Sequence, residues 1–294
     1  MVMTRDYGEG SIGAVTSTLC SLLGIAPPSL CAEPPLQRVL AELAPIPPGL
    51  GRIPHAAGEA LDGAQVEKCL IYAPDALGNH LYSRYGSLFA PVLGSAPLAI
   101  PLRSVMPSVT PVCFASMFTG APPERHGIQR PERPRPVLQG DTLFDALLRA
   151  GKRVAIVAAP ATSIGRLFLG RALDYFPQAY DPQVTQRVLS LLAADQHDII
   201  VAYHQEYDDL MHKTSPYDEG ALQAAANHVA AFAQLAEAFD RAWSRYHRAI
   251  LFAPDHGAHV DPLTGRGTHG QDIPEDMEVV HFWGLRRAVR LPAP

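Results

Sequence analysis

Residues 249–257 read AILFAPDHG, an apolar run that passes directly into Asp255, His256 and Gly257. Short runs of apolar and β-branched residues bounded by turn residues are typical of buried strands. Loops at the carboxyl ends of parallel strands line the crevice where ligands bind, and a glycine lets such a loop turn sharply. The stretch therefore predicts a core strand that delivers two potential metal ligands to such a crevice.

The same kind of strand recurs along the chain. The other apolar runs are KCLIYA at 68–73, RVAIVAA at 153–159, DIIVAY at 198–203 and EVVHFW at 278–283. Segments with helical spacing lie between several of them, at 141–151, 182–194 and 219–243. Alternating strands and helices are typical of a mostly parallel sheet that is covered on both faces. We therefore expect an α/β fold, a three-layer sandwich with a mostly parallel central sheet flanked by helices.

The first sixty residues differ from the rest of the chain. Residues 11–25 read SIGAVTSTLCSLLGI, which indicates an amphipathic helix, and the span that follows to Pro54 is crowded with proline. Nothing in this stretch predicts a second core. We expect residues 1–60 to form an N-terminal helix and a proline-rich segment that pack on the main domain, and residues 61–294 to form that domain.

The composition is that of an ordinary globular protein. The chain has 294 residues, of which 47% are hydrophobic and 18% charged, and its formal net charge is -5. These values exclude a disordered chain and give no general attraction to duplex nucleic acid or to an anionic membrane. The first residues contain no apolar run of signal-peptide or membrane-span length, and the four cysteines form no CxxC motif. We therefore expect a cytoplasmic protein without a membrane or nucleic acid partner, either monomeric or homo-oligomeric.

Aspartate and histidine residues follow three of the predicted strands. The residues with suitable side chains are Asp75, Asp208, His212, Asp255 and His256, with His269 and His281 later in the chain. Taken singly, each is more typical of a turn, a helix cap or a surface contact. Together, carboxylates and neutral imidazoles are the ligands expected for zinc or a similar divalent ion, and seven of them suffice for two ions.

Five sequence segments resemble the alkaline phosphatase superfamily. They are YAPDALG, PSVTPVCFASMFTGAPPERHGI, YDDLMHKTSP, APDHGAH and GTHGQDIPEDMEVVHFWG, and they occur in the order and approximate spacing of that superfamily from about residue 68 to residue 284. They are most similar to its nucleotide pyrophosphatase/phosphodiesterase branch. The resemblance implies an alkaline phosphatase-like catalytic domain that uses two divalent metal ions, most often zinc, with manganese, iron or magnesium as alternatives.

The resemblance also implies roles for individual residues. One metal is expected on Asp208, His212 and His269, and the second on Asp75, Asp255, His256 and the hydroxyl oxygen of Thr110. Thr110 stands where the superfamily places its nucleophile, so a phosphothreonine intermediate is expected, with Ser108 as a nearby competitor for this role. A hydroxyl is a poor nucleophile at neutral pH, and a directly bound divalent cation would make its oxygen reactive.

The nucleophile segment departs from two related patterns. Sulfatases of the superfamily carry C-x-P-x-R there, whereas this chain has TPVCF with Phe114 in place of the arginine, which disfavours sulfatase action. The phosphodiesterase branch has an asparagine three residues after the nucleophile, where this chain has Cys113. Cys113 and Lys213 are therefore candidate substrate contacts, while His204, His259 and His281 have no assigned role.

These patterns favour a phosphodiesterase or phosphatase that acts on a small soluble phosphoester. A phosphomutase of the same superfamily is one alternative, although the chain has no insertion between Thr110 and Asp208 large enough for the cap that shields a mutase intermediate from water. A non-catalytic metal- or phosphate-binding protein is another.

The order of the segments carries one further expectation. The helix at 11–25 resembles one that the superfamily usually carries after its last metal-binding histidine. We therefore expect a circularly permuted order, with this helix beside the C-terminal strand near residues 286–292 and with the two termini close together.

Overall fold

A computed structural model describes residues 10–43, 61, 63–131 and 137–289 of the chain. Within these residues a 7-stranded sheet has the order β2-β9-β6-β1-β5-β3-β4. Its strands are β1 Lys68–Pro74, β2 Leu98–Arg103, β3 Val154–Ala158, β4 Asp174–Pro177, β5 Ile199–His204, β6 Arg248–Phe252 and β9 Glu278–Arg286. All of its pairings are parallel except those of β9, which runs antiparallel to β6 and β2. The predicted mostly parallel sheet is confirmed.

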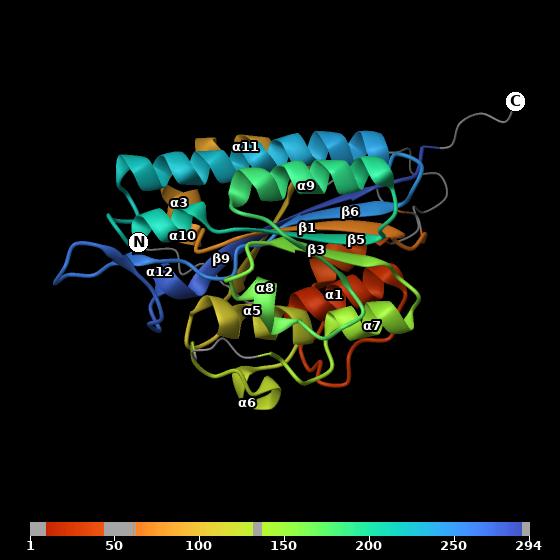
Figure 1. Cartoon of the computed structure of the whole chain (residues 1–294), viewed down its shortest axis with the longest axis horizontal. Helices are drawn as coiled ribbons and strands as arrows, with labels where there is room; N and C mark the ends of the chain where they lie inside the picture. Colours follow the sequence, from red (N-terminus) through yellow and green to blue (C-terminus); the bar gives the residue numbers. More distant parts are fainter. Residues whose placement is uncertain (1–9, 44–60, 62, 132–136, 290–294) are drawn as a thin grey trace, which may run out of the picture.

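Helices cover both faces of this sheet, as Figure 1 shows, with α9 and α11 on one face and α1, α5, α7 and α8 on the other. The helices are α1 Ala14–Leu23, α2 Gln37–Leu40, α3 Asn79–Arg84, α4 Ala90–Ser95, α5 Thr110–Thr119, α6 Pro123–His126, α7 Leu143–Arg149, α8 Ile164–Leu167, α9 Asp181–Ala194, α10 Glu206–Met211, α11 Glu219–Ala242 and α12 Pro274–Met277, with 3-10 turns at Ala41–Leu43 and Gly86–Phe89. A hairpin is formed by β7 His259–Val260 and β8 Gly267–Thr268. The three-layer sandwich is therefore confirmed.

Strand β1 shows how the two apolar layers form. All of its residues are buried, and successive side chains point to opposite faces of the sheet. Leu70 and Tyr72 belong to the cluster with α9 and α11, whereas Cys69 and Ile71 belong to the cluster with α1 and α5. Burial on both faces explains why the central strands read as continuous apolar runs.

The N-terminal helix α1 packs on the main sheet. Thr16 donates a hydrogen bond to the carbonyl of Met117 in α5 at 2.7 Å, and the buried side chains of α1 share one apolar cluster with Trp283 and Leu285 of the C-terminal strand β9. The expected domain boundary near residue 60 and the expected proximity of the termini fall outside the described residues, so the permuted order stays a hypothesis. In the part of the chain that the structure covers, no helix has the length and apolar character needed to cross a membrane.

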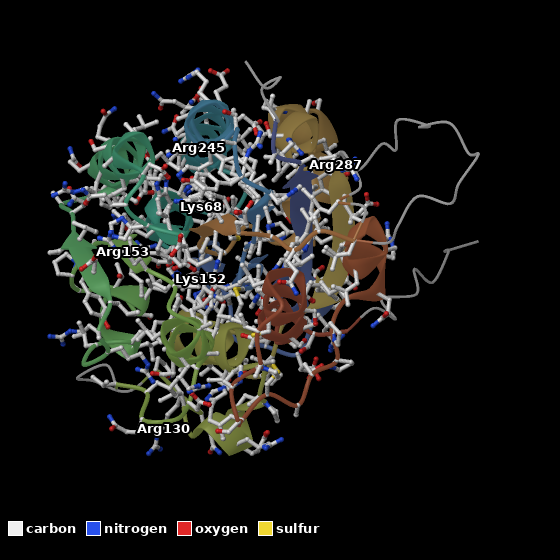
Figure 2. The ribbon with its side chains drawn as sticks, turned by 90° about the vertical axis from the view of Figure 1, so that its right-hand side faces the viewer. Lys68, Arg130, Lys152, Arg153, Arg245 and Arg287 are labelled. Atoms are coloured by element: carbon white, nitrogen blue, oxygen red, sulfur yellow. The ribbon has the colours of Figure 1, made fainter. Side chains whose placement is uncertain are left out.

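Basic side chains gather at the amino-terminal end of the parallel strands, which faces the viewer in Figure 2. Lys68, the first residue of β1, donates to Asp195 at 2.7 Å, and Arg245 pairs with the same carboxylate. Lys152 donates to the carbonyl of Glu67 at 3.0 Å. These partners offset the positive charge at this end of the sheet. The carboxyl ends of the parallel strands, which precede the Asp and His residues that the sequence singled out, lie at the opposite side, toward α10 and α12 (Figure 1).

Candidate active site

The carboxyl ends of β5, β1 and β6 lie side by side because these strands are neighbours in the sheet. Backbone hydrogen bonds continue the pairing beyond the strands: Asp75 N–H donates to the carbonyl of His204 at 2.9 Å, and Ala253 N–H donates to that of Tyr72 at 2.8 Å. The loops after the three strands therefore leave the sheet together. This places the predicted ligands in one region, as expected for the carboxyl ends of neighbouring parallel strands.

Asp75, Asp255 and His256 form one buried group, called here the β1/β6 group. His256 Nε2 lies 3.4 Å from Asp75 Oδ1 and 3.5 Å from Asp255 Oδ2. The next residue, Gly257, packs so closely on α12 that a Cβ there would lie 2.0 Å from the carbonyl oxygen of Glu275. Glycine is thus needed for close backbone approach, which holds the two preceding side chains in place.

Asp208, His212 and His269 form a second group, called here the α10 group. Asp208 lies in α10, His212 directly follows that helix, and His269 follows the β7–β8 hairpin. The Nε2 atoms of the two histidines are 3.1 Å apart, and Asp208 Oδ1 lies 3.4 Å and 3.5 Å from them. The His269 ring stacks on His256 with 4.1 Å between the ring centroids, so the two groups adjoin.

The three histidines of these groups are oriented in the same way. Their Nδ1 atoms lie next to backbone carbonyl oxygens: His212 with Gly267 at 2.9 Å, His269 with Ser108 at 2.8 Å and His256 with Gly257 at 2.9 Å. A carbonyl only accepts hydrogen bonds, so each Nδ1 carries the proton. In the neutral form of each ring, Nε2 then presents a lone pair toward the carboxylates, an arrangement typical of metal-binding histidines.

Two carboxylate oxygens of the groups have no donor. Asp208 Oδ1 and Asp255 Oδ2 are buried, and neither has a hydrogen-bond partner among the described residues. Burial, with the nearby charge of Asp208, raises the pKa of Asp75 to about 8, and burial lowers the pKa of His256 to about 3. Lone pairs and carboxylates that converge without donors fit divalent cations, which would satisfy both.

The hydroxyl of Thr110 lies against the β1/β6 group. Thr110 is the first residue of α5, and its Oγ1 lies 3.3 Å from each Asp75 oxygen and 3.4 Å from His256 Nε2. The N-terminus of a helix favours negative charge, which suits a phosphate bound there. The competitor Ser108 is directed elsewhere, since its hydroxyl donates to the carbonyl of Gln271 at 3.4 Å.

The two candidate substrate contacts lie in different surroundings. Cys113 is buried one turn after Thr110, and its Sγ lies 3.2 Å from the hydroxyl of Ser104, which donates to the carbonyl of Asp255 at 2.7 Å. Burial raises the pKa of the Cys113 thiol well above its ordinary value. Lys213 is exposed and directly follows His212 of the α10 group.

Tyr203 joins the site although the sequence did not single it out. Its hydroxyl donates to Asp75 Oδ2, and its ring packs edge-on against Phe114 with 5.6 Å between the centroids. A tyrosine inside an apolar run is most simply read as a core residue. The one signal that pointed further was its place next to the end of β5, where a side chain can reach the neighbouring strand end.

The histidines without assigned roles have partners within the fold. His281 in β9 is buried, with Nε2 2.8 Å from the carbonyl of Pro254. His259 Nδ1 lies 2.8 Å from Asp276, whose carboxylate also accepts from the backbone N–H of Gln271, so this pair holds the loop that carries His269. His204 belongs to a separate buried network behind α10.

The sequence model of the family described as type I phosphodiesterase / nucleotide pyrophosphatase matches residues 95–281, which is more than half of the chain. The chain belongs to this family. The match includes Thr110, the α10 group, Asp255 and His256, whereas Asp75 precedes it and joins the site through the sheet. The predicted place in the alkaline phosphatase superfamily is thereby confirmed.

Two solved structures are similar to this member of the family. A 2-O GAG sulfatase has a TM-score of 0.54 at 12% identity, with 75% of this chain and 64% of that chain covered. Phosphonoacetate hydrolase from Sinorhizobium meliloti 1021, solved with phosphonoacetate, has a TM-score of 0.49 at 19% identity, with 71% of this chain and 60% of that chain covered. The chain thus spans less than two thirds of either structure, and the likeness to the sulfatase supports the fold. The comparison with curated proteins gave no match.

Proposed function

We propose that this protein is a metal-dependent phosphoric ester hydrolase that cleaves a small soluble phosphodiester or phosphomonoester through a phosphothreonine intermediate on Thr110. The observation that carries the proposal is that three histidine Nε2 atoms and two buried carboxylate oxygens without donors lie in two adjoining groups, one of which contacts the Thr110 hydroxyl. Family membership supports the same reaction class.

We assign one divalent cation, zinc in the first instance, to the α10 group and a second to the β1/β6 group with Thr110 Oγ1. Both groups supply carboxylate and imidazole ligands, which suit zinc and, less strongly, manganese, iron or magnesium. Cations bound there would supply the positive charge that stabilises the developing negative charge on the attacking and departing oxygens.

The residues of the chain account for the remaining steps. Thr110 Oγ1 forms a bond to phosphorus as the bond to the leaving oxygen breaks, and the leaving oxygen takes a proton from water. Asp75, whose oxygens lie at 3.3 Å, would accept the Thr110 proton once a bound cation keeps it in the carboxylate form. Tyr203 holds Asp75 by donating to its second oxygen, and the N-terminus of α5 favours the negative phosphoryl group. Water then attacks the phosphothreonine, the bond between phosphorus and Oγ1 breaks, and Oγ1 takes back the proton from Asp75 while a proton of the attacking water leaves to solvent.

Cys113 and Lys213 remain our candidates for substrate contact, with different roles. We propose that Lys213, which is exposed and directly follows His212 of the α10 group, meets an anionic part of the substrate. Cys113 would act through Ser104 and the backbone of Asp255, because its thiol is buried.

The nucleophile can be tested with nitrophenyl phosphate and bis-nitrophenyl phosphate in the presence of zinc or manganese. Thr110→Ala should reduce turnover by more than about 1000-fold, since loss of a nucleophile removes most of the catalysis. Zinc stoichiometry should stay at the wild-type value, because the Asp and His ligands of both groups remain, and acid-quenched wild type should carry a phosphoryl group on Thr110.

Ser108→Ala is the matched control, because it removes the competing hydroxyl and leaves Thr110 in place. It should retain most of the activity. Unchanged turnover in Thr110→Ala would reject the assignment of Thr110 as the nucleophile. Absence of nitrophenol release by the wild type from both substrates would favour the alternative of a non-catalytic binding protein.

A further inference from the structure

The first turn of α10 is held by side chains from other helices. The first N–H groups of a helix have no partner within it, and the N-cap residue of α10, Gln205, provides no side-chain cap. Gln205 N–H instead donates to both oxygens of Asp181 at 3.1 Å and 3.0 Å, and Glu206 N–H donates to Asp181 Oδ2 at 2.9 Å. Tyr207 N–H donates to His228 Nε2 at 3.1 Å.

These two acceptors belong to a buried polar set that we call the support network: Tyr72, Asp181, His204 and His228. Asp181 is the first residue of α9 and His228 lies within α11, so the network joins both long helices to α10. The Tyr72 hydroxyl lies 2.8 Å from His204 Nδ1 and 3.2 Å from His228 Nδ1. His204 Nε2 lies 3.3 Å from the hydroxyl of Thr185.

The support network has the composition of a metal site, but its hydrogen bonds are already complete. Asp181 Oδ2 lies 3.8 Å from His204 Nδ1 and 3.9 Å from His228 Nε2, and both Asp181 oxygens accept backbone N–H groups. His228 Nε2 accepts the N–H of Tyr207, so its lone pair is in use. A cation would have to displace these donors, which would then be buried without partners.

A helix as short as α10 cannot fix its own position. It runs only from Glu206 to Met211, and isolated helices of this length are unstable, so its placement depends on what it contacts. Two of the three side chains of the α10 group, Asp208 and His212, depend on this turn. The network contacts residues 205–207, immediately before Asp208.

We infer that Asp181 and His228 are positioning residues for the α10 group: they hold the first turn of α10 so that Asp208 and His212 meet His269. This inference rests on the proposed function, because it assumes that the α10 group binds a cation. It predicts that loss of Asp181 weakens one of the two cation sites and spares the other.

The test is zinc binding by the full chain, measured by competition with a chromophoric chelator. In a His256→Ala background, which isolates the α10 group, Asp181→Ala should weaken zinc binding by about 10–100-fold, the usual cost of losing a partner that orients metal ligands. In a His212→Ala background, which isolates the β1/β6 group, the same change should leave zinc affinity within about twofold. Asp181→Asn keeps one carbonyl oxygen for the N–H groups and should restore most of the affinity.

Asp218→Ala is the matched control, since Asp218 caps α11 by accepting from Gly220 N–H at 3.0 Å and lies outside the network. It removes the same kind of cap and should leave zinc affinity unchanged. If Asp181→Ala does not fold, His228→Leu removes the acceptor of Tyr207 N–H and should weaken the same site.

The outcomes separate the two proposals. A wild type that binds no zinc would overturn the proposed function and, with it, this inference. A wild type that binds two ions, with equal zinc affinity of the α10 group in wild type and Asp181→Ala, would overturn the inference alone. A third zinc ion that is lost in Asp181→Ala would make the network residues ligands and would also overturn it.

Discussion

The α10 group and the support network make an instructive pair, because each places one aspartate and two histidines with ligand atoms within 4.8 Å of one another. In the α10 group, two Nε2 atoms lie 3.1 Å apart and Asp208 Oδ1 has no donor in the described structure. In the support network, both oxygens of Asp181 accept backbone N–H groups. The two sets therefore differ in their supply of hydrogen-bond donors and not in residue type or proximity, and we expect this difference to distinguish a metal site from a structural network.

The largest expected effect concerns Asp255, one of the two aspartates with a carboxylate oxygen that has no donor in the described structure. Asp255→Asn should lower zinc-dependent turnover by more than about 100-fold, since a ligand matters at least as much as the partners that orient it. In the presence of a chelator the same variant should be more stable than wild type by about 1–3 kcal/mol, because a buried carboxylate without a full set of donors has been removed.

Denaturant unfolding with EDTA measures this second part. Asp218→Asn serves as the control, because asparagine caps a helix about as well as aspartate, and it should change neither quantity. If the free energy of unfolding of Asp255→Asn in EDTA is lower than that of wild type in EDTA, the Asp255 carboxylate is not destabilising without a cation, which contradicts its proposed role as a ligand.

Chelation of the wild type should have the next largest effect. A ligand that binds only the folded state at 1000 times its dissociation constant stabilises a protein by about 4 kcal/mol. Removing zinc at that saturation should lower the free energy of unfolding by this amount for each bound ion, and Thr110→Ala should respond in the same direction because its Asp and His ligands are intact. Urea midpoints that are equal with and without EDTA would exclude cation binding at both groups.

The smallest effect concerns the support network and is a dependence on pH. Burial lowers the pKa of His228 to about 3, whereas an unfolded histidine titrates near its ordinary value of 6.5. Between these values the unfolded chain binds a proton that the folded chain does not, so the stability from neutral His228 is present above pH 6.5 and is lost as the pH falls toward 3.

His228→Leu should therefore flatten the stability profile of the chelated protein between pH 4 and 6.5, by at most about 1.4 kcal/mol per pH unit. Urea unfolding at several pH values measures the difference from wild type. Parallel profiles would mean that His228 is charged in the folded protein, and the completed network described above would be wrong.

The central strands could be predicted because their signal is local. β1, β5 and β6 are buried on both faces and read as largely apolar runs, and an aspartate follows each of them within four residues. The edge strands β2 and β4 escaped prediction. They are short and partly exposed, and β2 contains Pro101, which edge strands tolerate but which weakens the strand signal in a sequence.

The candidate site could be predicted in part. The resemblance to the superfamily brought Asp75, Thr110 and the other proposed ligands into one set, and the structure places them together. The role of Tyr203 was not predicted, because its place near the end of β5 is only a weak signal and its hydrogen bond to Asp75 depends on which strands are neighbours. The sequence also could not distinguish His212, a proposed metal ligand, from His228, whose Nε2 accepts a backbone hydrogen bond, since both are histidines in or beside helices.

The amino-acid sequence by itself determined the kinds of groups available: apolar runs long enough for core strands, and carboxylates and imidazoles at their ends. Only the tertiary structure decided which of these groups lack donors and which are saturated. The physical reason is that a buried polar atom is satisfied by neighbours in space, and here those neighbours are backbone groups of α10 and side chains from α9 and α11, far apart along the chain.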